Sequence, residues 1–255
     1  MENGFLKDRV ALVTGGGQGV GRGIALGLAK AGASVVVTGR TESKLDDVCA
    51  EIEGMGGTAA GWACNIKDGD AIGALIKKIE ERFGRLDILV NNAQEVPLGP
   101  LLAVDDDAFM AGFVSGPLAT HRLMKACHSM LKQGDNGVVF NLASSAGVRW
   151  DMANYGAYGA VKQAIRALTR AAASEWGPDN IRVLSIAPHA DSPGLKKWIE
   201  TNPEEARVFF QTIPLRRVGG CETDIGEAVA ALCDPAFSYL TGATIPLDGG
   251  QANFD

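Results

Sequence analysis

Tyr158 and Lys162 are the residues whose types and spacing best suit chemistry. They lie four positions apart, so a helix would place the phenol and the ammonium on one face. A free phenol with a pKa near 10 is a poor proton donor or acceptor at neutral pH. Because a neighbouring ammonium favours the phenolate, we expect Lys162 to lower the pKa of Tyr158. A Tyr-x-x-x-Lys pair also arises by chance on exposed helices, so the assignment of chemistry to this pair depends on other motifs in the sequence.

A pair of serines precedes this helix. Ser144 and Ser145 follow the β-like segment 137–142, at the carboxyl end of a predicted strand. Open α/β sheets bind ligands at that edge. A hydroxyl there could donate a hydrogen bond to a substrate carbonyl and hold it near Tyr158. The alternative is that either serine only caps the turn.

A glycine-rich turn forms the second chemical motif. The sequence TGGGQGVG, residues 14–21, follows an apolar run and opens a helix-periodic segment. Backbone amides in such a turn can bind a pyrophosphate at the helix N-terminus. Gly15 would permit the tight turn, and Gly19 and Gly21 would let the helix approach the phosphates. The spacing departs from strict G-x-G-x-x-G, so the alternative is a plain strand-to-helix turn.

The end of the next strand, 34–38, bears on which dinucleotide would bind. A carboxylate there binds the ribose 2′-hydroxyl of NAD, whereas an arginine pairs with the 2′-phosphate of NADP. The chain has Gly39-Arg40 at this point, and Glu42 lies two residues further on. Arg40 therefore favours NADP (NADPH) over NAD. The alternative is that Arg40 is an ordinary surface arginine.

Strand-like and helical segments alternate along the chain. Strands are predicted at 9–14, 34–38, 58–64, 86–91, 137–142, 181–186 and 243–247. Helices are predicted at 19–31, 42–54, 68–83, 105–132, 155–176 and 222–233, with Pro117 ending or kinking the long one. This alternation predicts the α/β class: a single-domain, Rossmann-type doubly wound parallel sheet of about seven strands with helices on both faces. A polar, proline-bearing stretch at 189–217 interrupts it.

Composition narrows the class of protein. The 255 residues are 46% hydrophobic and 21% charged, and the net charge is −6 without a basic stripe, which argues against a nucleic-acid partner. No signal peptide or membrane-spanning run is recognisable, so no membrane partner is expected. The five cysteines are odd in number and form no C-x-x-C pair. Reduced thiols and a cytoplasmic location are therefore predicted.

The sequence resembles a short-chain dehydrogenase/reductase over about residues 9–250. The resemblance rests on Thr14-Gly15…Gly19-Val20-Gly21, Asn91-Asn92-Ala93, Ser144, Tyr158, Lys162 and Thr241-Gly242…Asp248-Gly249-Gly250. It implies one domain over 1–255 and an oxidoreductase that transfers a hydride between NADP(H) and a carbonyl or secondary alcohol. It also implies a homotetramer, because many members pair subunits through the segment corresponding to 239–250.

The same resemblance assigns roles to residues. Tyr158 would be the catalytic acid-base, Lys162 would tune it and hold the nicotinamide ribose, and Ser144 would polarise the carbonyl. Ser144 is preferred because it lies three residues before Gly147, although the spacing to Tyr158 favours Ser145. The residues implied in cofactor binding are Gly15, Gln18, Gly19, Val20, Gly21, Arg40, Asn65, Ile66, Asn91, Ala93, Tyr158, Lys162 and Pro188. Asn65 stands in place of a more usual aspartate.

The substrate side is less specific. Ser144, Trp150 and His189 are predicted to contact the substrate, a small-molecule ketone or alcohol. Apolar side chains fall in the loops and in the substrate lid predicted at 189–217: Trp150, Met152, Trp198, Phe209 and Phe210. They suggest a hydrophobic ketone, with ordinary core and lid packing as the alternative. No metal site is predicted, because the three histidines have no acidic partner at a recognisable spacing.

Two positions near the predicted site depart from the family pattern. Gln94 replaces the glycine that usually follows Asn-Asn-Ala. Family members commonly carry an asparagine on the long fourth helix, where it supports a water-mediated proton relay. No asparagine lies between Asn92 and Asn136, and Gly116, or alternatively Ser115, stands at that position. Slow turnover is one expected consequence.

Two other functions stay open. His189 follows Pro188 where the family usually has glycine, and with Gln94 and Gly116 it motivates a nucleotide-binding regulatory protein that has lost efficient catalysis. The intact serine, tyrosine and lysine argue against that interpretation. The second alternative is an NAD-linked alcohol dehydrogenase in which Arg40 faces solvent.

Overall fold

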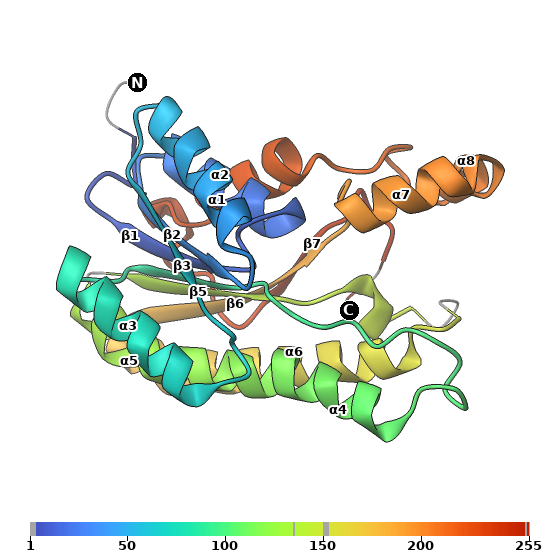
Figure 1. Ribbon diagram of the computed structural model, residues 1–255, viewed down its shortest axis with the longest axis horizontal. Coiled ribbons are helices and arrows are strands. Elements are labelled where there is room, and N and C mark those ends of the chain that lie inside the picture. The colour runs from blue at the N-terminus through green and yellow to red at the C-terminus, as the bar shows by residue number, and fades with distance from the viewer. Residues whose placement is uncertain (1–3, 135, 150–152, 253, 255) are drawn as a thin grey trace.

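The computed structural model describes residues 4–134, 136–149, 153–252 and 254, built around a parallel sheet of seven strands (Figure 1). The strands are β1 (Val10–Thr14), β2 (Ser34–Gly39), β3 (Ala59–Ala63), β4 (Ile88–Asn91), β5 (Gly137–Leu142), β6 (Ile181–Pro188) and β7 (Thr244–Leu247). Their order in the sheet is β3-β2-β1-β4-β5-β6-β7, with every neighbouring pair parallel. The predicted fold class is confirmed.

Helices cover both faces of this sheet, with α1 and α2 on one side and α3, α5 and α6 on the other (Figure 1). The helices are α1 (Gly19–Lys30), α2 (Glu42–Gly54), α3 (Gly69–Phe83), α4 (Asp106–Phe113), α5 (Ala119–Gln133), α6 (Gly156–Trp176), α7 (Pro193–Thr201), α8 (Pro203–Thr212) and α9 (Glu227–Ala231). None of the helices in the described residues is long and apolar enough to cross a membrane.

Two apolar layers hold the sheet between its helices. Strand β2 shows why: Val35, Val36 and Val37 are all fully buried, because neighbouring positions point to opposite faces and both faces are covered. One layer packs Ile24 of α1 among its neighbours, and the other packs Leu123 of α5. Burying apolar side chains on both faces is what the continuous apolar runs of the sequence predict.

The predicted break at Pro117 takes a different form. α4 and α5 are joined by a π-helical segment, Val114–Leu118, that contains the proline. The Ala119 N–H bonds to the carbonyls of Gly116 and Val114. A π-helical turn shifts the hydrogen-bond register, so the chain passes a residue without an N–H and the helical path continues.

The polar stretch 189–217 was expected to interrupt the alternation, and it folds into two short helices. α7 and α8 project from one end of the molecule, beyond the carboxyl ends of the strands (Figure 1). Ser192 starts α7 by accepting a hydrogen bond from Leu195 N, and Pro193 follows at the first helical position. Sequence reasoning missed these helices, since polar residues and prolines obscure their periodicity.

Strand order reverses between β1 and β4, where consecutive crossovers leave in opposite directions. In open α/β sheets ligands bind outside the carboxyl ends of the strands at such a point. The glycine-rich turn follows β1, and Asn91 ends β4. The fold therefore brings the two motifs to the edges of one crevice.

Candidate active site

The glycine-rich turn is built for close approach. Gly15 has φ +63° and Gly19 has φ +56°, a conformation that glycine adopts without strain. A Cβ on Gly21 would lie 2.3 Å from the Gly15 carbonyl oxygen, so only glycine fits there. α1 begins at Gly19 without a side-chain cap or an acidic residue in its first turn. Its first N–H groups are therefore free to bind an anion, and this cradle suits a dinucleotide pyrophosphate.

Thr14 ties the turn to the end of β4. Its hydroxyl donates to the Val90 carbonyl at 3.2 Å and accepts from the N–H groups of Asn92 and Ala93 at 3.0 and 3.1 Å. The Asn92 side chain donates in turn to the Thr14 carbonyl at 2.8 Å. These bonds fix the two sides of the crevice relative to each other. Neither Thr14 nor Asn92 was assigned this role from the sequence.

The ends of β2 and β3 carry the residues predicted around the adenosine. Arg40 follows β2, and its side chain is 74% exposed, with Nη1 3.6 Å from Glu95 Oε1. Lys67 Nζ lies 2.9 Å from the same carboxylate. Ile66 is buried, and Asn65 accepts a hydrogen bond from Lys67 N at 3.2 Å. Two cations thus converge on one carboxylate beside the predicted ribose position.

Ser144, Tyr158 and Lys162 come together at the carboxyl end of β5. Ser144 caps the short turn Ser145–Gly147 after β5 by accepting a hydrogen bond from Ala146 N at 3.2 Å, and its hydroxyl also hydrogen-bonds to the Tyr158 phenol. The Lys162 ammonium lies 5.4 Å from the centre of the Tyr158 ring and donates to the Leu142 carbonyl. Both Tyr158 and Lys162 project from α6, as their spacing predicts. The cluster can bind a carbonyl oxygen and move a proton to it.

The expected effect of Lys162 on Tyr158 is wrong for this structure. Burial raises the pKa of Tyr158 to about 12, and the bond to Ser144 opposes that rise only in part. Burial also lowers the pKa of Lys162 to about 7. The ammonium loses its solvation in the same apolar surroundings, so it is a weaker source of positive charge than its type suggests. The phenol is consequently protonated at neutral pH.

A buried polar network holds α6 on the sheet beneath this cluster. Asn141 Nδ2 donates to Thr169 Oγ1 at 3.0 Å, and Asn91 Nδ2 donates to Asn141 Oδ1 at 2.8 Å. Ser185 donates to Thr169 at 2.9 Å. Sequence reasoning named Asn91 and missed the others. The available signal was a polar residue within an otherwise apolar strand or helix face.

His189 faces the lid helices at the end of β6, directly after Pro188. Its ring lies 5.3 Å from that of Phe209, which in turn lies 5.7 Å from Trp198. His189 Nδ1 is buried without a hydrogen-bond partner, and burial lowers the pKa of the imidazole. The residue also lines a cavity of about 570 Å³ together with Asp248. Trp150 and Met152 lie outside the described residues.

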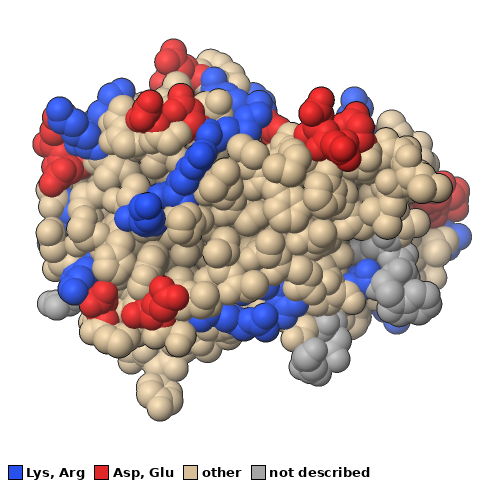
Figure 2. All heavy atoms as spheres, turned by 90° about the horizontal axis from the view of Figure 1, so that it is seen from below, with Lys and Arg blue, Asp and Glu red and all other residues tan. Residues whose placement is uncertain are grey.

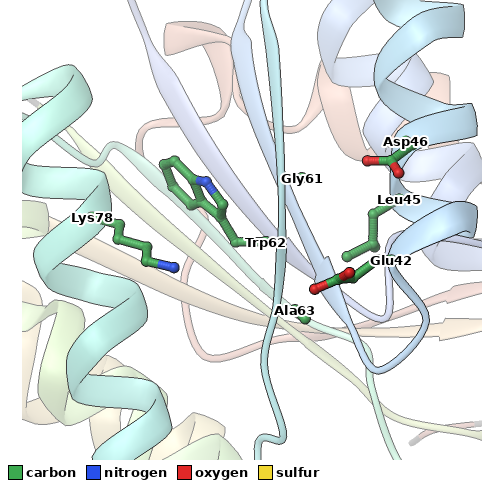
Figure 3. Close-up of a pocket in the computed structure, with 7 residues that line it drawn as sticks. All are labelled: Glu42, Leu45, Asp46, Gly61, Trp62, Ala63 and Lys78. Atoms are coloured by element: carbon green, nitrogen blue, oxygen red, sulfur yellow. The ribbon is translucent and has the colours of Figure 1, made fainter.

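A separate hollow of about 190 Å³ lies along the outer edge of β3 (Figure 3). Glu42, Leu45 and Asp46 approach it from α2, and Trp62 points toward Lys78 of α3. None of the predicted site residues lines it. The lining of this hollow is thus separate from the residues assigned to the predicted site.

Comparison with known proteins gives matches along nearly the whole chain. A family model described as enoyl-(acyl carrier protein) reductase matches residues 15–252. The 12alpha-hydroxysteroid dehydrogenase of a Clostridium species is 38% identical over 97% of this chain and 98% of its own length.

Solved structures also match nearly the whole chain. A putative short-chain alcohol dehydrogenase from Sinorhizobium meliloti is 35% identical, with a TM-score of 0.89 over 96% of this chain and 97% of that one. A putative NAD(P)-dependent gluconate 5-dehydrogenase from Beutenbergia cavernae, solved with bound NADP at low occupancy, is 30% identical. Its TM-score is also 0.89, over 96% of this chain and 97% of that one.

Proposed function

Because the chain belongs to the short-chain dehydrogenase/reductase family and is an NAD(P)-dependent oxidoreductase, we propose that it transfers a hydride between NADP(H) and a hydrophobic ketone or secondary alcohol. The observation that carries this proposal is the meeting of Ser144, Tyr158 and Lys162 beside the glycine cradle. In this proposal the nicotinamide, when bound, supplies or accepts the hydride.

In this proposal the protein's own groups bind the dinucleotide and orient it. The turn Gly15–Gly21 would hold the pyrophosphate through backbone N–H groups, and Asn65 and Ile66 would flank the adenine. Asn91, Ala93 and Pro188, at the ends of β4 and β6, would border the nicotinamide half. The unpartnered Asn91 Oδ1 at that edge is a buried acceptor available to a ligand.

Proton transfer falls to Tyr158 in this proposal. Ser144 would donate to the substrate oxygen and fix its position within reach of the phenol. Burial raises the pKa of Tyr158 to about 12, so the phenol keeps its proton at neutral pH and is a weaker acid than a free phenol. In the reductive direction it would donate this proton to the substrate oxygen, which becomes a strongly basic alkoxide as the hydride arrives. Lys162, whose pKa burial lowers to about 7, can then return a proton at a similar pH.

The preference for NADP rests on Arg40. Its distance of 3.6 Å from Glu95 is too long for a good hydrogen bond, so its guanidinium has donors to offer a 2′-phosphate. Lys67 lies on the same carboxylate, so the Arg40–Glu95–Lys67 cluster carries a net positive charge. An adenosine 2′-phosphate would compete with Glu95 for Arg40 here.

The proposed substrate is hydrophobic because the lid at 189–217 carries aromatic rings toward His189. Phe209 and Trp198 form a contiguous aromatic wall, and the imidazole keeps an unpartnered nitrogen for one polar group of the substrate. A largely apolar wall with a few placed polar groups is typical of small-molecule sites.

We further propose a homotetramer in a cytoplasmic location. α6 presents Ala160, Ala167 and Ala171 to solvent, small residues that let another helix approach closely. Figure 2 shows few charged side chains over the middle of this face. The free thiols of the described cysteines suit a reducing compartment. Mass photometry at nanomolar concentration tests the assembly, and a purely monomeric mass contradicts it.

The test of the function is NADPH oxidation against a panel of carbonyls. The panel contains a 12-oxo steroid, 5-ketogluconate and simple hydrophobic ketones and aldehydes, with the matching alcohols and NADP in the reverse direction. We expect turnover of apolar ketones that is lost in Tyr158→Phe. NADPH binding without turnover of any compound would support the other candidate, a regulatory nucleotide-binding protein.

That second candidate is favoured by one feature of the site. We propose that the chain is an atypical member of its family, because Gly116 and Ser115 stand where the relay asparagine is usual. Ser115 Oγ accepts from Glu95 N at 3.0 Å and donates to the Ala111 carbonyl at 2.7 Å, so its hydroxyl is committed to holding the loop after β4. The proton path must therefore use another group.

A further inference from the structure

Three charged side chains from three different strand ends meet at the adenosine end of the crevice. Arg40 follows β2, Lys67 lies four residues past β3, and Glu95 lies four residues past β4. Glu95 Oε1 lies 3.6 Å from Arg40 Nη1 and 2.9 Å from Lys67 Nζ. One carboxylate thus joins segments that are far apart in the sequence.

The Arg40–Glu95 pair spans the place where the glycine-rich turn leaves the sheet. β1 lies between β2 and β4 in the strand order, so the ends of β2 and β4 are about 10 Å apart. In this fold the adenosine ribose binds at the tip of the second strand. The pair therefore lies where the 2′ substituent of the ribose would bind.

Glu95 is the anchored member of this pair. Its backbone N–H donates to Ser115 Oγ at 3.0 Å, and Ser115 is buried. The neighbouring Lys67 is fixed as well, because Arg122 Nη1 donates to the Lys67 carbonyl at 2.7 Å. The Glu95 side chain is 34% exposed, whereas that of Arg40 is 74% exposed. Arg40 is therefore the member that can turn from the carboxylate to another anion.

We propose that Glu95 is a positioning residue that limits how strongly the site prefers NADPH over NADH. Without a cofactor, Glu95 holds Arg40 across the adenosine site. NADPH binding requires its 2′-phosphate to displace the carboxylate from the guanidinium, and the two anions repel each other. Lys67 keeps the displaced carboxylate paired. NADH carries a hydroxyl at this position, so it binds without this exchange.

This inference rests on the proposed dinucleotide site, and binding measurements alone test it. Glu95→Gln removes the negative charge and keeps the length of the side chain. The matched control is Glu175→Gln, the same change at an exposed glutamate on α6. Kd values for NADPH and NADH are measured by fluorescence titration for each variant, at 0.05 and 0.5 M NaCl.

We expect Glu95→Gln to tighten NADPH binding about fivefold and to leave the Kd of NADH within about twofold, because a partly exposed ion pair contributes no more than about this factor. The gain should shrink at 0.5 M NaCl, where salt screens the charges. Glu175→Gln should match the wild type. An unchanged or weaker affinity for NADPH, or an equal gain for both cofactors, overturns the inference.

Two fragments of the cofactors locate the effect. Adenosine 2′,5′-bisphosphate carries the 2′-phosphate and adenosine 5′-monophosphate lacks it, and neither has a nicotinamide. In isothermal titration calorimetry, Glu95→Gln should tighten binding of the bisphosphate alone, by about the same factor as for NADPH. No change for either fragment would place the effect away from the adenosine end and overturn the inference.

Lys67→Met should have the opposite sign. It removes the cation that shares the carboxylate, so Glu95 pairs with Arg40 alone and NADPH binding should weaken about threefold. When Glu95→Gln is also present, Lys67→Met should have almost no effect, because Lys67 acts through that carboxylate. An equal loss with and without Glu95→Gln would show that Lys67 contacts the phosphate itself, and would overturn its part in the inference.

Failure of the proposed function gives a different result. If neither NADPH nor NADH binds the wild type, the dinucleotide site itself is overturned, and the inference with it. If both bind and no carbonyl on the panel is reduced, the reductase proposal fails, and the ratio of the two Kd values still decides the role of Glu95. Binding of both cofactors with the same ratio in wild type and Glu95→Gln overturns the inference alone.

Discussion

The buried polar network under α6 is paired within the chain, whereas some buried polar groups at the carboxyl edge of the sheet have no partner. In the interior, Asn141, Thr169 and Ser185 bond to one another at 2.9–3.0 Å. At the edge, the Gln94 amide and His189 Nδ1 are buried with no partner. Most buried polar groups in proteins are paired, so the unpaired ones need an explanation.

Whether a buried polar group is paired indicates whether it contributes to stability or is available to bind a ligand. A network that is complete in the folded chain contributes to rigidity and has nothing left to offer a ligand. An unpaired buried group lowers stability and gains when a ligand supplies the partner. Asn91 lies on the boundary, since its Nδ2 bonds inward to Asn141 and its Oδ1 is unpartnered.

Removing the proton donor at the edge should have the largest effect. We expect Tyr158→Phe to lower kcat about 10³-fold, because the variant keeps the ring and loses the acid. NADPH affinity, measured by fluorescence titration, should change by less than about threefold, since a phenol-to-phenyl change leaves the glycine cradle intact. Retention of more than a tenth of the wild-type kcat would show that another group donates the proton.

The interior network should respond in the opposite way. Thr169→Val keeps the shape and leaves the donors of Asn141 and Ser185 without their acceptor. We expect the free energy of unfolding in urea to fall by about 2–3 kcal/mol. Gln94→Met should change this free energy by less than about 0.5 kcal/mol, or raise it, because the amide has no hydrogen-bond partner in the protein. Equal decreases in the free energy of unfolding of the two variants would show that the paired network and the unpaired amide contribute alike to stability.

The pH dependence of stability tests whether the buried Lys162 ammonium, which lies at the carboxyl edge, destabilises the folded protein. Burial lowers its pKa to about 7, whereas the unfolded chain has the ordinary value of 10.5. Below pH 7 both states are protonated and the folded state bears the whole cost of a buried ammonium. Between about 7 and 10.5 the unfolded state binds the extra proton, so this cost falls as the pH rises.

The expected outcome is a stability difference that narrows with pH. Lys162→Met should be more stable than the wild type at pH 6.5, because a buried charge is exchanged for an apolar chain. The difference should shrink by at most about 1.4 kcal/mol per pH unit up to pH 9.5, measured by urea unfolding. A difference that stays constant over this range would mean that Lys162 keeps its proton in the folded protein.

Much of the fold and the place of the site follow from the sequence. Continuous apolar runs such as 34–38 predict strands buried on both faces, and parallel strands bring their carboxyl ends to one edge. Chemical motifs at strand ends therefore had to meet. The resemblance then supplied the roles proposed for Ser144, Tyr158 and Lys162.

What sequence reasoning missed depends on contacts between distant segments. The raised pKa of Tyr158 comes from burial, which is set by everything packed around α6. The partner of Thr169 is a residue 28 positions away on β5. Likewise, the sequence shows only that Gln94 replaces a usual glycine, and only the structure puts its amide beside Gly116.

The smallest expected effect lies at the exposed end of the cofactor site. Arg40 is 74% exposed, so its pairing with a 2′-phosphate is screened by water, and we expect Arg40→Ala to reduce the preference for NADPH over NADH about tenfold. Kd values for both cofactors give that ratio directly. Arg170→Ala, at an exposed arginine on α6, should leave it unchanged. An unchanged ratio in Arg40→Ala would remove the arginine as the cause of any preference.

Because salt screens an exposed pair, the preference of the wild type for NADPH should also weaken between 0.05 and 0.5 M NaCl, by about threefold, while NADH binding stays nearly constant.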